Sequence, residues 1–96
     1  MDYKHVGFFS NETDKEITLF LELRCEEIRM APGHEIELLI EDVEGATPVS
    51  IIYRSDGLQL YPRQGCPSWL IRFKGQEIEP GYPTDLAAYE SRVSPT

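Results

Sequence analysis

The sequence has few cysteines, few histidines and no long apolar run, and each scarcity excludes a class of protein. Its 96 residues hold two cysteines and two histidines. No two of these side chains fall at the close spacing of a structural zinc site, so we expect no metal. No stretch approaches the ~20 apolar residues of a transmembrane helix, and the N-terminus lacks the pattern of a secretory signal. We therefore expect a cytoplasmic protein with no membrane partner.

Catalytic and phosphate-binding patterns are also missing. The seven glycines lie in separate turns, so the chain has no glycine-rich phosphate loop. Cys66 with His5 or His34 is the best nucleophile and base that the chain offers, and no local signature joins them. The seventeen acidic residues offer too many pairs to single out two catalytic carboxylates. We predict a protein that is not an enzyme and needs no cofactor.

Basic residues are scarce, and the excess of acidic over basic residues lies in the first half of the chain. The net charge is −8; residues 1–48 hold 12 acidic and 4 basic side chains, and residues 49–96 hold five of each. Such an excess repels phosphate backbones and anionic lipids, so neither nucleic acid nor a membrane surface is an expected partner. Solubility alone explains net acidity, and a basic protein partner is the alternative.

The sequence does contain alternation of apolar and polar residues, which is typical of β-strands. Apolar residues take every odd position from Ile17 to Cys25, and a second alternating run covers Glu35–Glu41. We predict that these two runs form a hairpin around the turn at Ala31–His34, with a break near Glu26 and Glu27 where the parity changes. Further strands are expected over residues 3–9, 49–54, 58–61, 69–74 and 76–79.

These elements predict an all-β fold, a small antiparallel sandwich or partly open barrel of about six to eight short strands. Residues 1–93 would form a single domain and residues 94–96 a frayed tail. The chain would end in a short C-terminal helix capped by Thr84 or Asp85, or in an irregular tail. Asp56-Gly57 marks a tight hairpin turn.

The placement of single residues on the strands gives further expectations. Cys25 shares the parity of the strand leucines and is expected in the core, whereas Cys66 lies in a loop. The two thiols are expected to be free, with a Cys25–Cys66 disulfide as the alternative. Trp69 is expected to fill the core. Part of the outer surface is expected to be covered, by the chain itself, by a second copy or by a foreign partner, because four apolar residues sit at polar positions: Phe20, Leu39, Ile52 and Leu70.

Two candidate binding surfaces follow from these patterns. The predicted hairpin would carry an acidic surface made of Glu22, Glu35, Glu37 and Glu41. The second half of the chain would carry a separate aromatic and basic surface made of Tyr61, Tyr82, Arg54 and Arg72.

The sequence therefore favours a non-catalytic protein–protein interaction module that binds a basic partner through its acidic strands. One alternative is an inhibitor or immunity-type protein that neutralises a basic toxin or nuclease. The other is a small-ligand-binding β-barrel with the aromatic side chains at its mouth. A homodimer is compatible with each of these functions.

Overall fold

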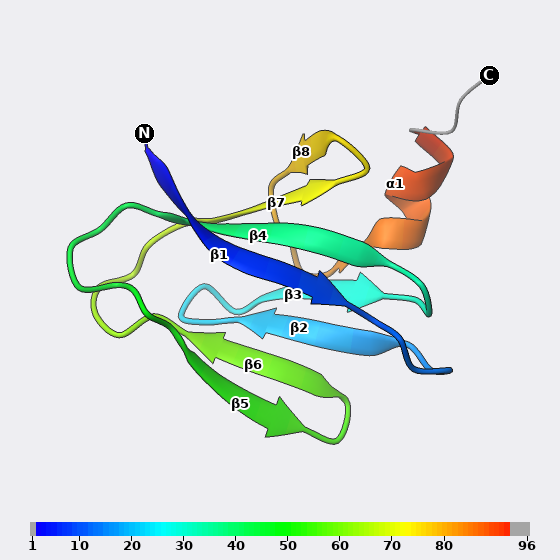
Figure 1. The fold of residues 1–96 in the computed structure, drawn as a ribbon, viewed down its shortest axis with the longest axis horizontal. Coiled ribbons are helices and arrows are strands. Elements are labelled where there is room, and N and C mark those ends of the chain that lie inside the picture. The colour runs from blue at the N-terminus through cyan, green and yellow to red at the C-terminus, as the bar shows by residue number, and fades with distance from the viewer. Residues whose placement is uncertain (1, 93–96) are drawn as a thin grey trace.

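Two β-sheets and one short helix make up the protein, in a computed structural model that describes residues 2–92 (Figure 1). The four-stranded sheet has the order β1 (Tyr3–Ser10), β4 (Glu35–Glu41), β7 (Trp69–Phe73) and β8 (Gln76–Ile78). The five-stranded sheet has the order β5 (Ser50–Arg54), β6 (Gly57–Tyr61), β2 (Ile17–Leu21), β3 (Glu26–Met30) and β9 (Thr84–Asp85). Helix α1 (Leu86–Arg92) ends the described chain.

The core lies between the two sheets, because each sheet turns one apolar face inward. On β4, Ile36, Leu38 and Ile40 are buried, and the glutamates between them lie on the other face. The same alternation buries these residues of the neighbouring strands: Leu19, Leu21, Ile28, Met30, Leu60, Trp69, Ile71 and Phe73. The predicted all-β sandwich and the short helix are therefore confirmed. The sheets do not close into a barrel.

The predicted long strand at Ile17–Cys25 is wrong in its second half. β2 ends at Leu21, the chain turns over residues 22–25, and β3 returns antiparallel with Ile17 beside Met30. The apolar residues at positions 23 and 25 extend the period-2 pattern only by chance. Leu23 is 55% exposed in the turn, and Cys25 is exposed with a φ of 57°.

The predicted hairpin between this region and Glu35–Glu41 is also wrong. The turn between β3 and β4 carries the chain from one sheet to the other, and β4 pairs with β1 and β7. Asn11 holds this crossing in place. Its amide nitrogen donates to the carbonyl oxygen of Met30 at 2.8 Å, and its backbone nitrogen donates to that of His34 at 2.9 Å.

The five-stranded sheet is not purely antiparallel as predicted. β2 pairs in parallel with β6, and β3 pairs in parallel with β9. Both pairings bring together segments that are distant in sequence, which alternation alone does not specify. Thr18 at the start of β2 donates its backbone N–H to the carbonyl oxygen of Asp56 at 2.9 Å, which continues the contact with β6 into the β5–β6 turn.

Several local predictions are confirmed. The hairpin around Asp56-Gly57 joins β5 and β6, and β8 is a short strand at the edge of its sheet. Asp85 caps helix α1, since its Oδ1 accepts the backbone N–H of Ala87 at 3.0 Å. The predicted frayed tail at residues 94–96 lies outside the described residues.

The chain covers its outer surface unevenly. Leu39 is only 5% exposed and Phe20 and Leu70 are half-buried, whereas Ile52 is 46% exposed. Trp69 is in the core as predicted, and its indole N–H donates to the carbonyl oxygen of Glu22 at 2.9 Å, which ties the two sheets together. Within residues 2–92, no helix has the length and apolarity needed to cross a membrane.

Candidate functional site

The four acidic candidates do not share one surface. Glu35, Glu37 and Glu41 alternate along β4 on the outer face of the four-stranded sheet. Glu22 lies in the β2–β3 turn of the five-stranded sheet, where its Oε2 accepts the side-chain amide of Gln59 at 2.7 Å. The acidic surface is therefore the outer face of β4, which we call the β4 acidic row, and Glu22 is not part of it.

Each member of the β4 acidic row has a partner within the molecule. Glu37 lies 2.7 Å from Nε2 of His5 and 3.4 Å from Nη1 of Arg72. Glu41 accepts the backbone N–H of Ser68 at 2.9 Å. Glu35 is exposed, and its Oε2 accepts a neutral hydroxyl, that of Ser10, at 2.6 Å. Glu35 is consequently the carboxylate of this row that is most accessible to a partner.

The predicted separation of a basic surface from the acidic one is wrong. Arg72 on β7 stands beside Glu37 in the register, and its Nε lies 3.2 Å from Glu77. Arg54 on β5 pairs with Asp56 at 3.2 Å and places its guanidinium 4.5 Å from the ring centre of Phe20. Both arginines are exposed as predicted, and each is paired with an acidic residue.

The remaining candidates lie apart from one another in the fold. Tyr61 ends β6 and is half-buried, whereas Tyr82 is 72% exposed in the segment before β9. Cys66 is exposed as predicted. Cys25 is also exposed, so the prediction that it is buried is wrong, and both thiols are free. Among the described residues, no three histidine, cysteine, aspartate or glutamate side chains gather as a metal site would require.

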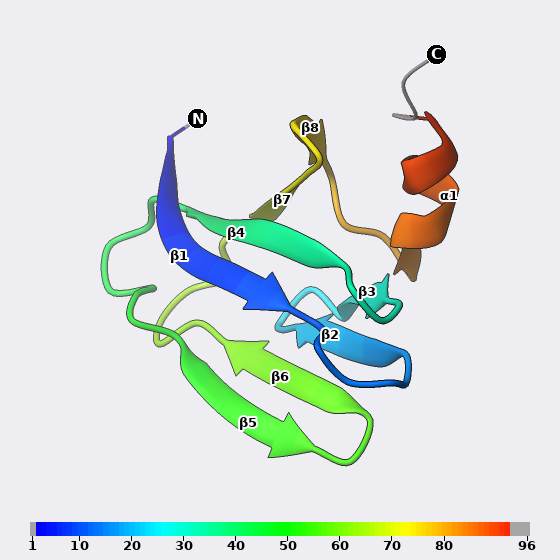
Figure 2. The same cartoon turned by 45° about the vertical axis from the view of Figure 1, so that its right-hand side comes forward.

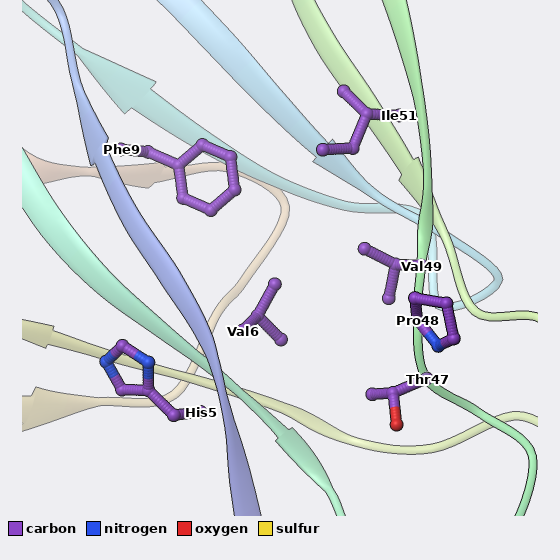
Figure 3. Close-up of a pocket in the computed structure, with 7 residues that line it drawn as sticks. All are labelled: His5, Val6, Phe9, Thr47, Pro48, Val49 and Ile51. Carbon is purple, nitrogen blue, oxygen red and sulfur yellow. The ribbon is translucent and has the colours of Figure 1, made fainter.

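A groove that sequence reasoning did not find runs between β1 and β5. These strands are the free edges of the two sheets on the same side of the sandwich, and β5 lies at the outer rim of the wider sheet (Figure 2). The groove has a volume of about 450 Å³. Figure 3 shows Val6 and Phe9 of β1 extending toward Val49 and Ile51, while the His5 ring lies on the other side of β1.

The groove exists because the two sheets differ in width. The register places Ile51 beside Leu60 and Tyr53 beside Leu58, on the face of β5 that continues the core. The four-stranded sheet ends at β1, so this face of β5 is left uncovered. Ile51 is 45% exposed and Tyr53 is 84% exposed. An inner face that remains exposed in this way is an expected binding surface.

The side chains that line the groove are mostly apolar: valine, isoleucine, proline and phenylalanine, with one threonine. The ionisable residue of the lining is His5, whose ring lies on the other side of β1 and contacts Glu37. One wall is the edge strand β1, and the other is residues 47–49, which lead into the edge strand β5, together with Ile51 of that strand. The outer backbone N–H and C=O groups of β1 and β5 have no partner strand within residues 2–92. Such edges accept an additional strand.

Comparisons with known proteins add no assignment. No protein-family model matches the chain, and neither a curated protein nor a solved structure matches it.

Proposed function

We propose that this protein is a non-catalytic interaction module that binds an extended segment of a partner protein at the free edge of β1. The observation that carries the proposal is the uncovered inner face of β5, which lies next to β1, the strand at the edge of the opposite sheet. Among residues 2–92, no strand of the four-stranded sheet lies at the position that would cover Ile51 and Tyr53. A partner segment in that position would extend this sheet to five strands.

The backbone of the edge favours a strand as the occupant. A strand added beside β1 forms main-chain hydrogen bonds along its length, and strands pair about 4.8 Å apart. Its alternate side chains would point inward onto Phe9, Ile51 and Tyr53, where they would replace water with apolar contact. Burying the exposed part of such side chains stabilises a complex by roughly 25 cal/mol per Å² of apolar surface.

The charge of the outer surface favours a basic partner. Side chains of the added strand that point outward would lie beside Phe8 and Ser10 of β1, with Glu35 and Glu37 on the next strand. Lysine and arginine are long enough to reach across one strand, and the net charge of −8 attracts them at longer range. The expected partner segment therefore alternates apolar and basic residues.

The other two predicted functions relate to this one differently. An inhibitor of a basic toxin or nuclease is a special case of the module, and the identity of the partner decides it. A small-ligand barrel would need a closed barrel, which the described strands do not form.

The test is a selection of displayed random peptides against the protein, followed by affinity measurement on the enriched sequences. Ile51→Thr and Tyr53→Thr should weaken binding several-fold, because they shrink the apolar inner face and keep strand propensity. Ile52→Thr is the matched control. Ile52 is 46% exposed, almost the same as Ile51 at 45%, but it lies on the opposite face of β5. Hydrogen exchange should slow along β1 when the peptide binds.

Three outcomes would overturn the proposal. The first is enrichment of peptides without alternating apolar and basic residues, or no enrichment. The second is an equal loss of affinity in Ile51→Thr and Ile52→Thr. The third is a concentration-dependent dimer that Ile51→Thr abolishes, since a second copy of the chain would then be the natural occupant.

A further inference from the structure

A second cavity opens at a different place, where β1, β3 and β7 begin. It has a volume of about 370 Å³. Its walls come from both sheets: Trp69 begins β7 of one sheet, and Glu26 begins β3 of the other. Its polar lining also includes Tyr3, Arg24, Ser68 and Glu79. The ionisable residue that lines the groove beside β5 is His5, whereas this cavity carries two carboxylates and a guanidinium.

Glu26 is placed in this cavity by the alternation of its own strand. It shares a face of β3 with Ile28 and Met30, which are both buried between the sheets. Its carboxyl group therefore points toward the interior, at the end of the sandwich. Oε1 of Glu26 is shielded from solvent and has no hydrogen-bond partner among the described residues. A buried acceptor without a donor is unfavourable and rare in folded proteins, so its presence calls for an explanation.

The neighbours of Glu26 leave its charge only partly compensated. Burial raises the pKa of this carboxyl group, Arg24 lowers it, and the negative charge of Glu79 raises it again. Arg24 lies close enough to act on Glu26, but its Nη2 donates to the carbonyl oxygen of Cys66 at 2.8 Å. The cavity thus combines two carboxylates, the Arg24 guanidinium and the aromatic side chains of Tyr3 and Trp69.

This combination selects the charge and the shape of a ligand. Two carboxylates against one guanidinium repel an anion and attract a cation. An organic cation supplies several N–H donors, and a hydrogen bond to a charged group is about twice as strong as a neutral one. Aromatic walls favour organic cations over hydrated metal ions. We infer that this cavity is a binding site for a guanidinium or primary ammonium group, held between Glu26 and Glu79.

The site is independent of the proposed strand-binding edge, because none of the residues that line one cavity line the other. The cation has two possible sources, a free small amine or the side chain of an arginine or lysine in a partner. Both present the same chemistry to Glu26 and Glu79. Failure of the peptide selection at β1 would leave this inference standing, and the reverse also holds.

Titration by two-dimensional ¹H–¹⁵N nuclear magnetic resonance tests the inference directly. The chain has a single tryptophan, so one indole N–H signal reports on Trp69 at the cavity wall. Agmatine represents a free cation, and N-acetyl-arginine amide represents a side chain. N-acetyl-citrulline amide is nearly identical in shape to the blocked arginine and carries no charge. Saturable shifts of Trp69 and of backbone signals near Glu26 are expected with at least one cation and not with the citrulline compound.

Glutamine substitutions locate the charge that matters. Glu26→Gln and Glu79→Gln should each weaken binding of the cation roughly tenfold, since each removes one charge-assisted hydrogen bond. Glu44→Gln is the matched control, because Glu44 is exposed in the turn that follows β4. Its affinity should equal that of the unmodified protein. Each variant's dispersed spectrum verifies that it is folded.

The inference is overturned if neither cation shifts the signals around Glu26 and Trp69 of the folded protein. It is also overturned if the citrulline compound shifts them equally, since charge would then play no part. If Glu26→Gln, Glu79→Gln and Glu44→Gln all weaken binding of the cation equally, the cation is attracted by the net charge of the protein and does not occupy a specific site. Binding of agmatine alone would identify a free amine as the ligand, and binding of blocked arginine alone would identify a side chain.

Discussion

His34 and Glu90 join the turn between the two sheets to the C-terminal helix. Nε2 of His34 lies 3.2 Å from Oε1 of Glu90, although 56 positions separate the two residues. The other ring nitrogen, Nδ1, accepts the backbone N–H of Ala31 at 3.0 Å. His34 is only 6% exposed, and its ring packs edge-on against Phe73 at a centroid distance of 5.3 Å. The histidine is therefore a structural side chain that uses both ring nitrogens.

Replacing His34 should destabilise the fold substantially. His34→Ala removes the acceptor of the Ala31 N–H, the contact with Glu90 and the packing on Phe73. We expect a loss of about 2–3 kcal/mol in the free energy of unfolding, as for other buried polar side chains. Urea unfolding followed by circular dichroism measures it. A midpoint equal to that of the unmodified protein would show that the turn holds without the ring.

The contribution of Glu90 should depend on pH. Its hydrogen bonds with His34 and then Lys74 hold the pKa of the carboxyl group below the usual value of 4.5. A carboxyl group whose pKa is lower in the folded state stabilises the protein above the unfolded value, and this stabilisation is lost as the pH falls through the folded value. We expect Glu90→Gln to lower the urea midpoint slightly near neutral pH.

The difference between the two proteins should disappear in acid, where Glu90 is protonated in both the folded and the unfolded state. Glu44→Gln, which removes the same charge from an exposed turn, controls for the change in net charge. A Glu90→Gln deficit that persists unchanged well below pH 4.5 would contradict this prediction.

Asn11 should be among the most sensitive positions of the chain. It is 1% exposed, and its side-chain amide donates to the carbonyl oxygens of Lys15 at 2.7 Å and Met30 at 2.8 Å. Its Oδ1 accepts the backbone N–H of Thr13 at 3.0 Å. Asn11→Ala removes these three hydrogen bonds inside the fold, so we expect a loss of about 3 kcal/mol in a urea titration. Ser10→Ala, an exposed neighbour on β1, should cost far less.

Two glycines offer a matched pair for testing how closely β2 and β6 approach. Gly7 and Gly57 have nearly the same φ, 158° and 157°. A Cβ at Gly7 would meet nothing, whereas a Cβ at Gly57 would collide with the backbone of Thr18. We expect Gly57→Ala to cost at least about 2 kcal/mol more than Gly7→Ala, because the parallel pairing of β2 and β6 must open. Thermal unfolding of both variants measures the difference, and equal values would refute the close approach.

Local patterns in the sequence predict much of this fold. Alternation locates most strands to within a few residues, Asp56-Gly57 predicts its hairpin, and Asp85 predicts its cap. The error in β2 arises because the chain leaves this strand without glycine, proline, asparagine or aspartate, the residues that usually mark a turn. Leu23 and Cys25 keep the parity of β2 but lie in a turn, so the pattern alone could not show where that strand ends.

The candidate groove could not be predicted because it depends on the relative width of two sheets. Ile51 and Tyr53 follow the pattern of residues that face a core, and they do face it. Their exposure follows from the end of the opposite sheet at β1, a property of long-range topology. The same holds for Arg72, since only the pairing of β4 with β7 brings it beside Glu37.

The order of strands in the five-stranded sheet constrains how the protein forms on the ribosome. β2 and β3 emerge together as a hairpin, but β6, which flanks β2, begins only at Gly57, 36 positions after the end of β2 at Leu21. The last of these strands, β9, pairs with β3 and is made later still, at Thr84. Nascent chains therefore expose both edges of the first hairpin during translation, so chains truncated before Gly57 should aggregate more readily than the finished protein.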